Sequence, residues 1–254
     1  MGAVAFIGAG PGAADLITLR GARRLAQAEV VLYDALADPA LRELAPEALW
    51  IPVGKRGFAD STGQSTINAL LVKHAREHRL VVRLKGGDPS IFGRLEEELE
   101  ALAAAGIAAE VIPGVTAAIA AAAHTQRPLT RRGGGRSVAL STAMTREGAL
   151  RAGRSADTEV FYMAGKQLAA LSRRLLAAGW PAETPASVVS RAGWPDALHS
   201  DHSVAQLADA TVLHAGRPSV VTVGAGARAV RKVVQAPGID AAQGLPAPAE
   251  TRAP

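Results

Sequence analysis

The feature that most constrains the fold is an alternation of apolar, strand-like runs with helical segments along the first part of the chain. Each run is short and rich in Val, Ile and Leu, and each is followed by a segment with helical periodicity. The five runs are residues 4–8, 30–34, 49–54, 80–86 and 109–114. This alternation is typical of parallel β-α units with helices on the faces of the sheet. We therefore predict an α/β domain over residues 1–130.

The pattern breaks near Thr130, where the segment TRRGGGRS has no periodicity. We interpret this segment as the connection between two domains. Strand-like runs resume at residues 137–142, 158–163, 186–192 and 219–224, and a further strand is expected over 198–203. An amphipathic helix is predicted over 168–179. A second α/β domain over residues 137–232 follows, and the Pro/Ala-rich residues 236–254 predict a disordered tail.

The stretch VVRLKGGDPSIFGR, residues 81–94, has the layout of a binding site. Its apolar run ends in two glycines, which allow a ligand to lie against bare backbone, and Asp88 can accept hydrogen bonds from ligand hydroxyls. The alternative is a tight strand-to-helix turn with Asp88 as the helix N-cap and Pro89 at the first helical position. The stretch alone leaves both interpretations open.

The first turn, GAGPGAADLITLRG, does not carry a dinucleotide-binding fingerprint. Gly8, Gly10 and Gly12 do not fit G-x-G-x-x-G, and Pro11 stands where that motif expects flexibility. A Walker A loop is absent from the sequence as well. A Rossmann nucleotide fold is therefore disfavoured.

Composition excludes several kinds of site. The chain has no cysteine, which excludes disulfides, thiolate metal sites and a thiol nucleophile. Of the six histidines, His74 and His78 would share a helix face, but their segment is charged and is interpreted as a solvated helix end. We expect no metal.

Charge and hydropathy bear on location and partners. No basic leader precedes the first strand and no apolar run approaches a membrane span, which predicts a cytoplasmic protein that does not enter membranes. Lys and Arg exceed Asp and Glu by 28 to 23, with the arginines spread along the chain. This excess suits a small polyanionic substrate as well as nucleic acid, and charge alone does not separate the two.

Motifs in a fixed order resemble those of the tetrapyrrole methylase family. The match runs in register from about Val4 to Gly224 and includes GAGPG, VLYD, VGKRG, Q-x-x-IN, RLKGGDPxxFGR, PGVTA, PLTRR and VFYMAG. LKGGDP marks the broad family, whereas VLYD with VGKRG is similar to the branch that acts on uroporphyrinogen.

The resemblance implies two α/β domains with the active-site cleft between them, S-adenosylmethionine as methyl donor, and a homodimer. It further implies methylation of two pyrrole carbons of uroporphyrinogen III to give precorrin-2 by way of precorrin-1, with no nucleic-acid partner. The donor contacts that it implies are Pro11, Gly86, Gly87, Asp88, Ile91, Thr116, Ala117, Met163 and Ala192. Most of these are suited to backbone contacts or to apolar walls.

The resemblance also implies Asp34 as a base and Lys55 as an acid. A pyrrole carbon that attacks the sulfonium methyl leaves a cationic ring, which must lose a proton, so a nearby carboxylate would help. The alternatives are a turn carboxylate for Asp34 and a substrate-carboxylate anchor for Lys55. Because the substrate carries many carboxylates, arginines are expected around it. The candidates are Arg56, Arg94, Arg131 and Arg132.

The chain departs from the family pattern at several positions, which are Ala13, Ser90, Leu95, Glu96, Arg131, Ala143 and Met144. Ser90, Leu95 and Glu96 lie beside the expected donor loop and Arg131 on the expected substrate face. A methylase of a later precorrin or of another tetrapyrrole is therefore the alternative on the same fold. A nucleic-acid-binding or regulatory module is a third hypothesis, which the intact KGGDP loop disfavours.

Overall fold

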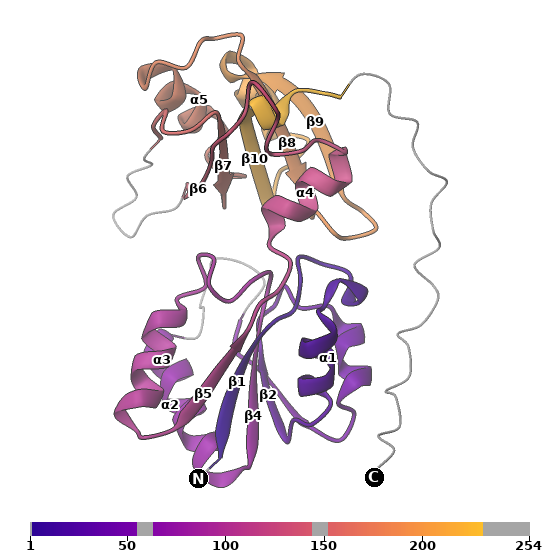
Figure 1. The fold of residues 1–254 in the computed structure, drawn as a ribbon, viewed down its shortest axis with the longest axis vertical. Helices are drawn as coiled ribbons and strands as arrows, with labels where there is room; N and C mark the ends of the chain where they lie inside the picture. Colours follow the sequence, from indigo (N-terminus) through magenta and orange to yellow (C-terminus); the bar gives the residue numbers. More distant parts are fainter. Residues whose placement is uncertain (1, 55–62, 144–151, 231–254) are drawn as a thin grey trace.

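Two five-stranded sheets, one above the other in Figure 1, organise the chain. The computed structural model describes residues 2–54, 63–143 and 152–230. The first sheet has the order β3-β2-β4-β1-β5, and all of its neighbouring strands are parallel. Its strands are β1 (Ala3–Gly8), β2 (Val30–Tyr33), β3 (Leu49–Pro52), β4 (Leu80–Lys85) and β5 (Ala108–Ile112). All five predicted runs are confirmed as strands.

Alternate residues along the central strands of the first sheet enter two separate cores. Ala5 and Ile7 of β1 pack on one face, whereas Val4 and Phe6 pack on the other. This follows from the two-residue period of a strand. The first core is covered by α1 (Leu19–Leu25) with short 3-10 turns at 14–16 and 39–44. The second is covered by α2 (Gln64–Glu77) and α3 (Leu95–Ala104) (Figure 1).

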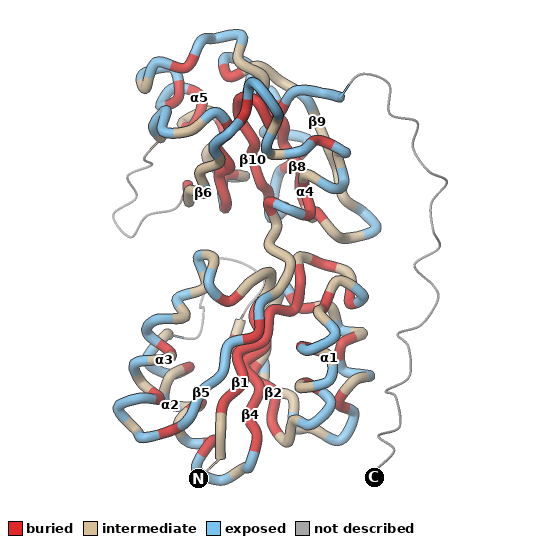
Figure 2. The backbone as a smooth tube through the Cα atoms, viewed as in Figure 1, coloured by how far each residue is buried: buried red, intermediate tan, exposed pale blue. Residues whose placement is uncertain are grey.

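The second sheet is mixed. Its order is β6-β7-β10-β8-β9, with β6 and β7 parallel and the other pairs antiparallel. The strands are β6 (Val138–Thr142), β7 (Thr158–Tyr162), β8 (Pro185–Ser190), β9 (Leu198–Ser203) and β10 (Ser219–Gly224). Helix α5 (Leu168–Ala177) packs on one face through Leu168, Leu171 and Leu175. The prediction of two α/β domains is confirmed, and Figure 2 shows the buried strands of both sheets in red.

Helix α4 (Ala117–Thr125) follows the first sheet in sequence but packs on the second. Its buried alanines, Ala118, Ala120 and Ala121, contact β7, β8 and β10. The chain therefore passes between the two sheets just before α4, at residues 113–116, as Figure 1 shows. The domain limits 1–130 and 137–232 stay a proposal, and this packing favours a division near Thr116 over one at residue 130. The expected tail, 236–254, lies outside the described residues.

One of the predicted helical segments differs in kind from its expectation. Residues 39–45, the segment with helical periodicity after the second strand-like run, form the 3-10 turn at 39–44, with Pro39 at its start. In the parts of the chain that the structure describes, no helix is both long enough and apolar enough to cross a membrane.

Candidate functional site

The switch point of the first sheet brings the two glycine-rich loops together. Strands β1 and β4 are parallel neighbours, and the loop after β1 leads to α1 on one face while the loop after β4 leads to α3 on the other. Open α/β sheets bind ligands at such a point, beyond the carboxyl ends of the strands. Here Gly10 and Gly87 form an isolated bridge, in which the Gly87 N–H donates to the Gly10 carbonyl at 2.7 Å.

The loops meet so closely that only glycine fits. A Cβ atom added to Gly114, which follows β5, would lie 2.3 Å from the Gly87 carbonyl oxygen. A Cβ added to Gly8 would lie 2.5 Å from the Gly114 Cα. Gly87 also has a φ of 71°, a left-handed conformation that favours glycine. The carboxyl ends of β1, β4 and β5 therefore present bare backbone.

Asp88 ties two of these loops together. Its Oδ2 accepts from the Gly114 N–H at 2.9 Å and its Oδ1 accepts from the Ser90 N–H at 2.8 Å. The helix after the loop begins only at Leu95, with Arg94 at the N-cap position and no side-chain cap. The alternative of Asp88 as helix N-cap with Pro89 in the first turn is therefore wrong. The carboxylate keeps further lone pairs for a ligand.

Tyr162, at the end of β7, joins the second sheet to the segment between the sheets. Its hydroxyl lies 2.7 Å from the Thr116 Oγ1 and accepts from the Ala118 N–H at 3.3 Å. Thr116 is the N-cap residue of α4, but its side chain makes no cap. The Tyr162 hydroxyl instead accepts from an N–H of the first turn of α4. Burial raises the pKa of Tyr162 although both hydrogen bonds oppose that shift, so the phenol is neutral near pH 7.

The first turn reaches the second sheet as well. The Ala13 N–H donates to the Gly193 carbonyl at 2.8 Å. A Cβ on Gly193 would lie 2.9 Å from the Pro11 Cγ. Pro11 and Ala192, both predicted as donor contacts, therefore lie in loops that touch each other across the two sheets.

The remaining predicted donor contacts lie around the same point. Ile91 and Ala117 pack together with the second-sheet cluster that includes Tyr162 and Ala192. Met163 directly follows Tyr162, is 43 % exposed and has a left-handed φ of 57°. Gly86 is close to the loop after β2, because a Cβ on it would lie 3.0 Å from the Leu36 Cβ. The structure thus places the predicted residues in loops around one junction, and their contacts with a donor stay a prediction.

Asp34 lies at the carboxyl end of β2, one strand away from the glycine loops. Its Oδ1 accepts from Arg83 Nη2 at 2.6 Å and its Oδ2 accepts from the Gly86 N–H at 3.3 Å. Gly54 lies against it, because a Cβ there would lie 3.1 Å from the Asp34 Cα. Gly54 is the last described residue before Lys55, and Lys55 itself lies outside the described residues.

A buried network of charged side chains holds Asp34 in place. Arg83, Lys85 and Glu98 are 3 %, 3 % and 0 % exposed. Glu98 accepts from Arg83 Nε at 3.0 Å and from Lys85 Nζ at 2.7 Å. Burial opposes the charge on Arg83, but Asp34 and Glu98 together raise its pKa. Burial and the nearby Arg83 lower the pKa of Lys85.

Four residues of the site were not singled out from the sequence: Arg83, Lys85, Glu98 and Tyr162. Two cations within the otherwise apolar strand LVVRLK are a signal for buried charge that could have been used. Glu98 has no such signal, because it is one of three glutamates in the first turn of α3.

The four candidate arginines do not form one cluster. Arg94 makes two 2.7 Å hydrogen bonds to the Glu97 carboxylate on the surface of α3. Arg131 donates to the Arg228 carbonyl in the second domain, and Arg132 is exposed beside it. Arg56 and the departure Met144 lie outside the described residues. A shared role for these arginines at a substrate stays a prediction.

Known proteins match this chain in sequence over most of its length. The sequence profile of the family described as Tetrapyrrole (Corrin/Porphyrin) Methylases matches residues 3–208. The chain is 45% identical over 195 residues to uroporphyrinogen-III C-methyltransferase of Pseudomonas aeruginosa, covering 75% of this chain and 80% of that protein. It is 42% identical over 229 residues to siroheme synthase of Neisseria meningitidis serogroup C. That match covers 88% of this chain but only 48% of the longer protein.

Solved structures share the fold. Uroporphyrin-III C-methyltransferase from Thermus thermophilus, complexed with S-adenosylhomocysteine, superposes with a TM-score of 0.77 at 35% identity. The match covers 88% of this chain and 97% of that one. Cobalt-precorrin-4 methyltransferase superposes with a TM-score of 0.76 at 29% identity, covering 87% of this chain and 94% of that one.

Proposed function

The chain belongs to the tetrapyrrole (corrin/porphyrin) methylase family, and from this premise we propose that it methylates uroporphyrinogen III. S-adenosylmethionine is the methyl donor, and two pyrrole carbons are methylated in turn to give precorrin-2 by way of precorrin-1. Support comes from the similarity to the Pseudomonas and Thermus enzymes and from the complex of the latter with S-adenosylhomocysteine. The structural observation that carries the proposal is the meeting of GAGPG and KGGDP at the switch point.

The donor occupies this junction in the proposal. Backbone groups of the loops after β1, β4 and β5 contact the amino acid and ribose parts, and Asp88 accepts from ribose hydroxyls. Ile91, Ala117 and Ala192 provide apolar walls from the second-sheet side. A donor held between loops of both sheets keeps its methyl group in line with the acceptor carbon, which contributes more to the rate than acid-base help.

Asp34 is the proposed base. The pyrrole carbon forms a bond to the methyl carbon, the carbon–sulfur bond breaks and S-adenosylhomocysteine leaves. The ring is now cationic. It transfers a proton from a position next to the methylated carbon to the Asp34 carboxylate and regains neutrality. The Arg83 guanidinium holds one carboxylate oxygen, which fixes the direction of the other. Lys55 is the proposed acid.

The assembly is proposed to be a homodimer, and its support is the family resemblance. Light scattering during gel filtration measures this directly. A dimer has twice the chain mass of 26.0 kDa, and elution at the single-chain mass at micromolar concentration would contradict it.

The central experiment is a methylation assay with pure protein, S-adenosylmethionine and enzymatically generated uroporphyrinogen III. Mass spectrometry is expected to find a product heavier by two methyl groups. Calorimetric titration with S-adenosylhomocysteine serves as the control for a folded donor site. If the protein binds S-adenosylhomocysteine but leaves uroporphyrinogen III unchanged, the substrate assignment is wrong.

A second candidate keeps the donor and changes the substrate to a later precorrin. The similarity to cobalt-precorrin-4 methyltransferase and the departures at Ser90 and Arg131 favour it. In the structural superpositions, the identity of 35% to the Thermus uroporphyrin-III enzyme against 29% to this relative favours uroporphyrinogen III. Competing the two substrates in one assay separates the candidates, because the preferred substrate gains methyl groups first.

A further inference from the structure

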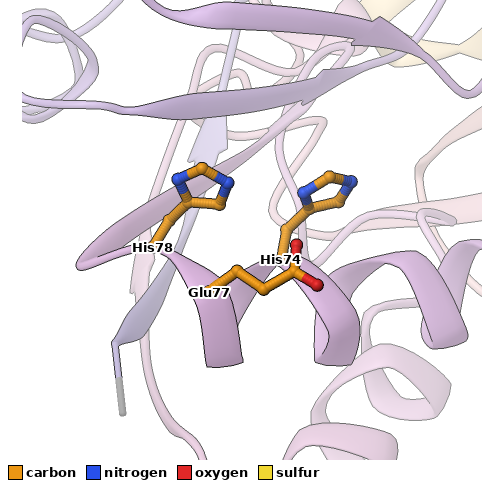
Figure 3. Close-up of side chains that lie close together, drawn as sticks. All are labelled: His74, Glu77 and His78. Carbon is orange, nitrogen blue, oxygen red and sulfur yellow. The ribbon is translucent and has the colours of Figure 1, made fainter.

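Three side chains with metal-binding chemistry gather at the carboxyl end of α2, far from the glycine loops. They are His74, Glu77 and His78, and one ligand atom from each lies within 4.8 Å of the others. Figure 3 shows both imidazole rings on the same side of the helix end, with a ring nitrogen of each facing the other. The i, i+4 spacing produces this arrangement. The segment also has the form H-x-x-E-H, which occurs in metal-binding helices.

His74 is the unusual member. It is 8 % exposed, and its Nδ1 is buried without a hydrogen-bond partner. In the described parts of the chain only one other buried side-chain nitrogen or oxygen, the Arg131 Nε, shares this state. A buried polar atom without a partner is costly, and a bound cation would satisfy it.

His78 is already oriented for such a role. Its Nδ1 lies 3.5 Å from Glu29 Oε2, and Glu29 is held by the Arg79 N–H at 2.9 Å. A carboxylate beside one ring nitrogen places the proton there and leaves the lone pair on the other nitrogen, as is usual for metal-binding histidines. The carboxyl end of a helix also carries partial negative charge, which favours a cation.

We propose that His74 Nδ1, His78 Nε2 and the Glu77 carboxylate bind one divalent transition-metal ion, with Zn²⁺ matching the ligand set. Imidazole and carboxylate ligands with water in the fourth position are common for zinc. Glu29 acts from outside the ligand set by orienting His78.

The position, away from the proposed donor site, indicates a role in stability and not in methyl transfer. The Gly2 N–H donates to the Ala75 carbonyl and the Ala3 N–H donates to the Arg79 carbonyl, at 2.8 and 3.0 Å. Strand β4 begins directly after the cluster, at Leu80. The ion would therefore hold together the end of α2, to which the start of β1 is hydrogen-bonded and which the start of β4 follows. The opposite ends of these strands carry the proposed donor loops.

The test is calorimetric titration of tag-free, chelator-treated full-length protein with ZnCl₂. One Zn²⁺ per chain and a raised Tm are expected. His78→Gln and Glu77→Gln are each expected to weaken binding about 10-fold or more. His124→Gln, which removes an exposed histidine on α4, is the matched control and is expected to bind as the wild type does. Thermal melts of the metal-free variants identify any loss of Zn²⁺ binding that comes from unfolding.

A second measurement avoids substitution of the buried His74. Histidine ¹⁵N NMR is expected to show Zn²⁺-dependent shifts at His74 Nδ1 and His78 Nε2, with the other histidines unchanged. Non-saturable binding, binding that His78→Gln does not weaken, or shifts confined to other histidines would overturn the site. Methylation activity plays no part in these readouts, so they are independent of the proposed function.

Discussion

At the scale of single residues, the most informative feature is how Asp34 is held. Its carboxylate is fixed by Arg83, and Arg83 is fixed by Glu98, which is fully buried and also binds Lys85. Burying charges is costly unless every one is paired and hydrogen-bonded. This network meets that condition, because two cations face two carboxylates over distances of 2.6–3.0 Å. A rigid, oriented Asp34 at the edge of the junction is the result.

Replacement of Glu98 by Gln tests this network. The change leaves Arg83 and Lys85 buried with one carboxylate fewer, and breaking a buried ion pair costs about 3–5 kcal/mol. Urea denaturation is expected to show a loss of that size in the free energy of unfolding. Glu97→Gln changes the preceding residue of the same helix, which is 46 % exposed, and is expected to cost less than about 1 kcal/mol. Equal losses in the two variants would contradict the importance of burial.

Asp34→Asn tests the proposed base. The amide keeps the shape of the carboxylate but does not take a proton, so kcat is expected to fall by about 10²-fold. Turnover is slowed rather than abolished, because alignment with a reactive sulfonium supplies much of the rate. Steady-state methylation measures kcat, and titration with S-adenosylhomocysteine is expected to give unchanged affinity. An unchanged kcat would assign Asp34 the alternative role of a turn carboxylate.

At the scale of elements, the site depends on three strand ends that meet without side chains between them. Gly8, Gly87 and Gly114 come from the ends of β1, β4 and β5, and their backbones are in contact. Parallel strands bring their carboxyl ends to one edge, and the switch point leaves that edge open. The packing of backbone on backbone explains why this part of the sequence is rich in glycine.

Gly114→Ala is therefore expected to damage the site. The added methyl group would meet the Gly87 carbonyl oxygen, and overpacking of this kind costs about 1–3 kcal/mol. Thermal denaturation is expected to show this loss, and titration to show weaker binding of S-adenosylhomocysteine. Gly134→Ala is the matched control, because a Cβ there meets nothing within 4 Å. Wild-type donor affinity in Gly114→Ala would argue against the junction as the donor site.

At the scale of the whole molecule, the contacts between the two sheets converge on the same junction. Tyr162 hydrogen-bonds to Thr116 and Ala118 at the passage between the sheets, and Ala13 hydrogen-bonds to Gly193. The Phe92 ring lies edge-on to the Tyr162 ring, with centroids 5.0 Å apart. A ligand at this junction would contact both halves and stabilise the folded protein by RT ln(1 + L/Kd), where L is the free ligand concentration.

Tyr162→Phe tests the link between the sheets. The change leaves the Ala118 N–H without its acceptor, and an unsatisfied buried donor costs about 1–3 kcal/mol. A lower Tm is expected, together with weaker binding of S-adenosylhomocysteine. Tyr33→Phe removes a hydroxyl that accepts from Arg42 at an exposed contact and is expected to have little effect. Equal effects of the two changes would contradict a special role for Tyr162.

The sequence by itself determined the strands, the class of fold and the family. Strand runs such as VAFIG and LVVRLK are legible because local hydrophobicity and period follow from burial within a sheet. The motifs also identified the loops of the junction, since the glycines of GAGPG and KGGDP let a strand end turn sharply and leave its backbone bare. The helices were less well determined, because a segment such as 39–45 has helical periodicity but forms a 3-10 turn that begins at Pro39.

Only the tertiary structure decided which distant residues act together. No local pattern states that Glu98 neutralises Arg83 and Lys85, that the Tyr162 hydroxyl caps α4, or that α4 packs on the second sheet. The same holds for Asp88, which the sequence left as either a helix cap or a ligand residue; the structure shows that it caps no helix and that it accepts from the Gly114 N–H. These contacts join residues far apart in sequence, and their energies come from burial and hydrogen bonding that exist only once the sheets have formed.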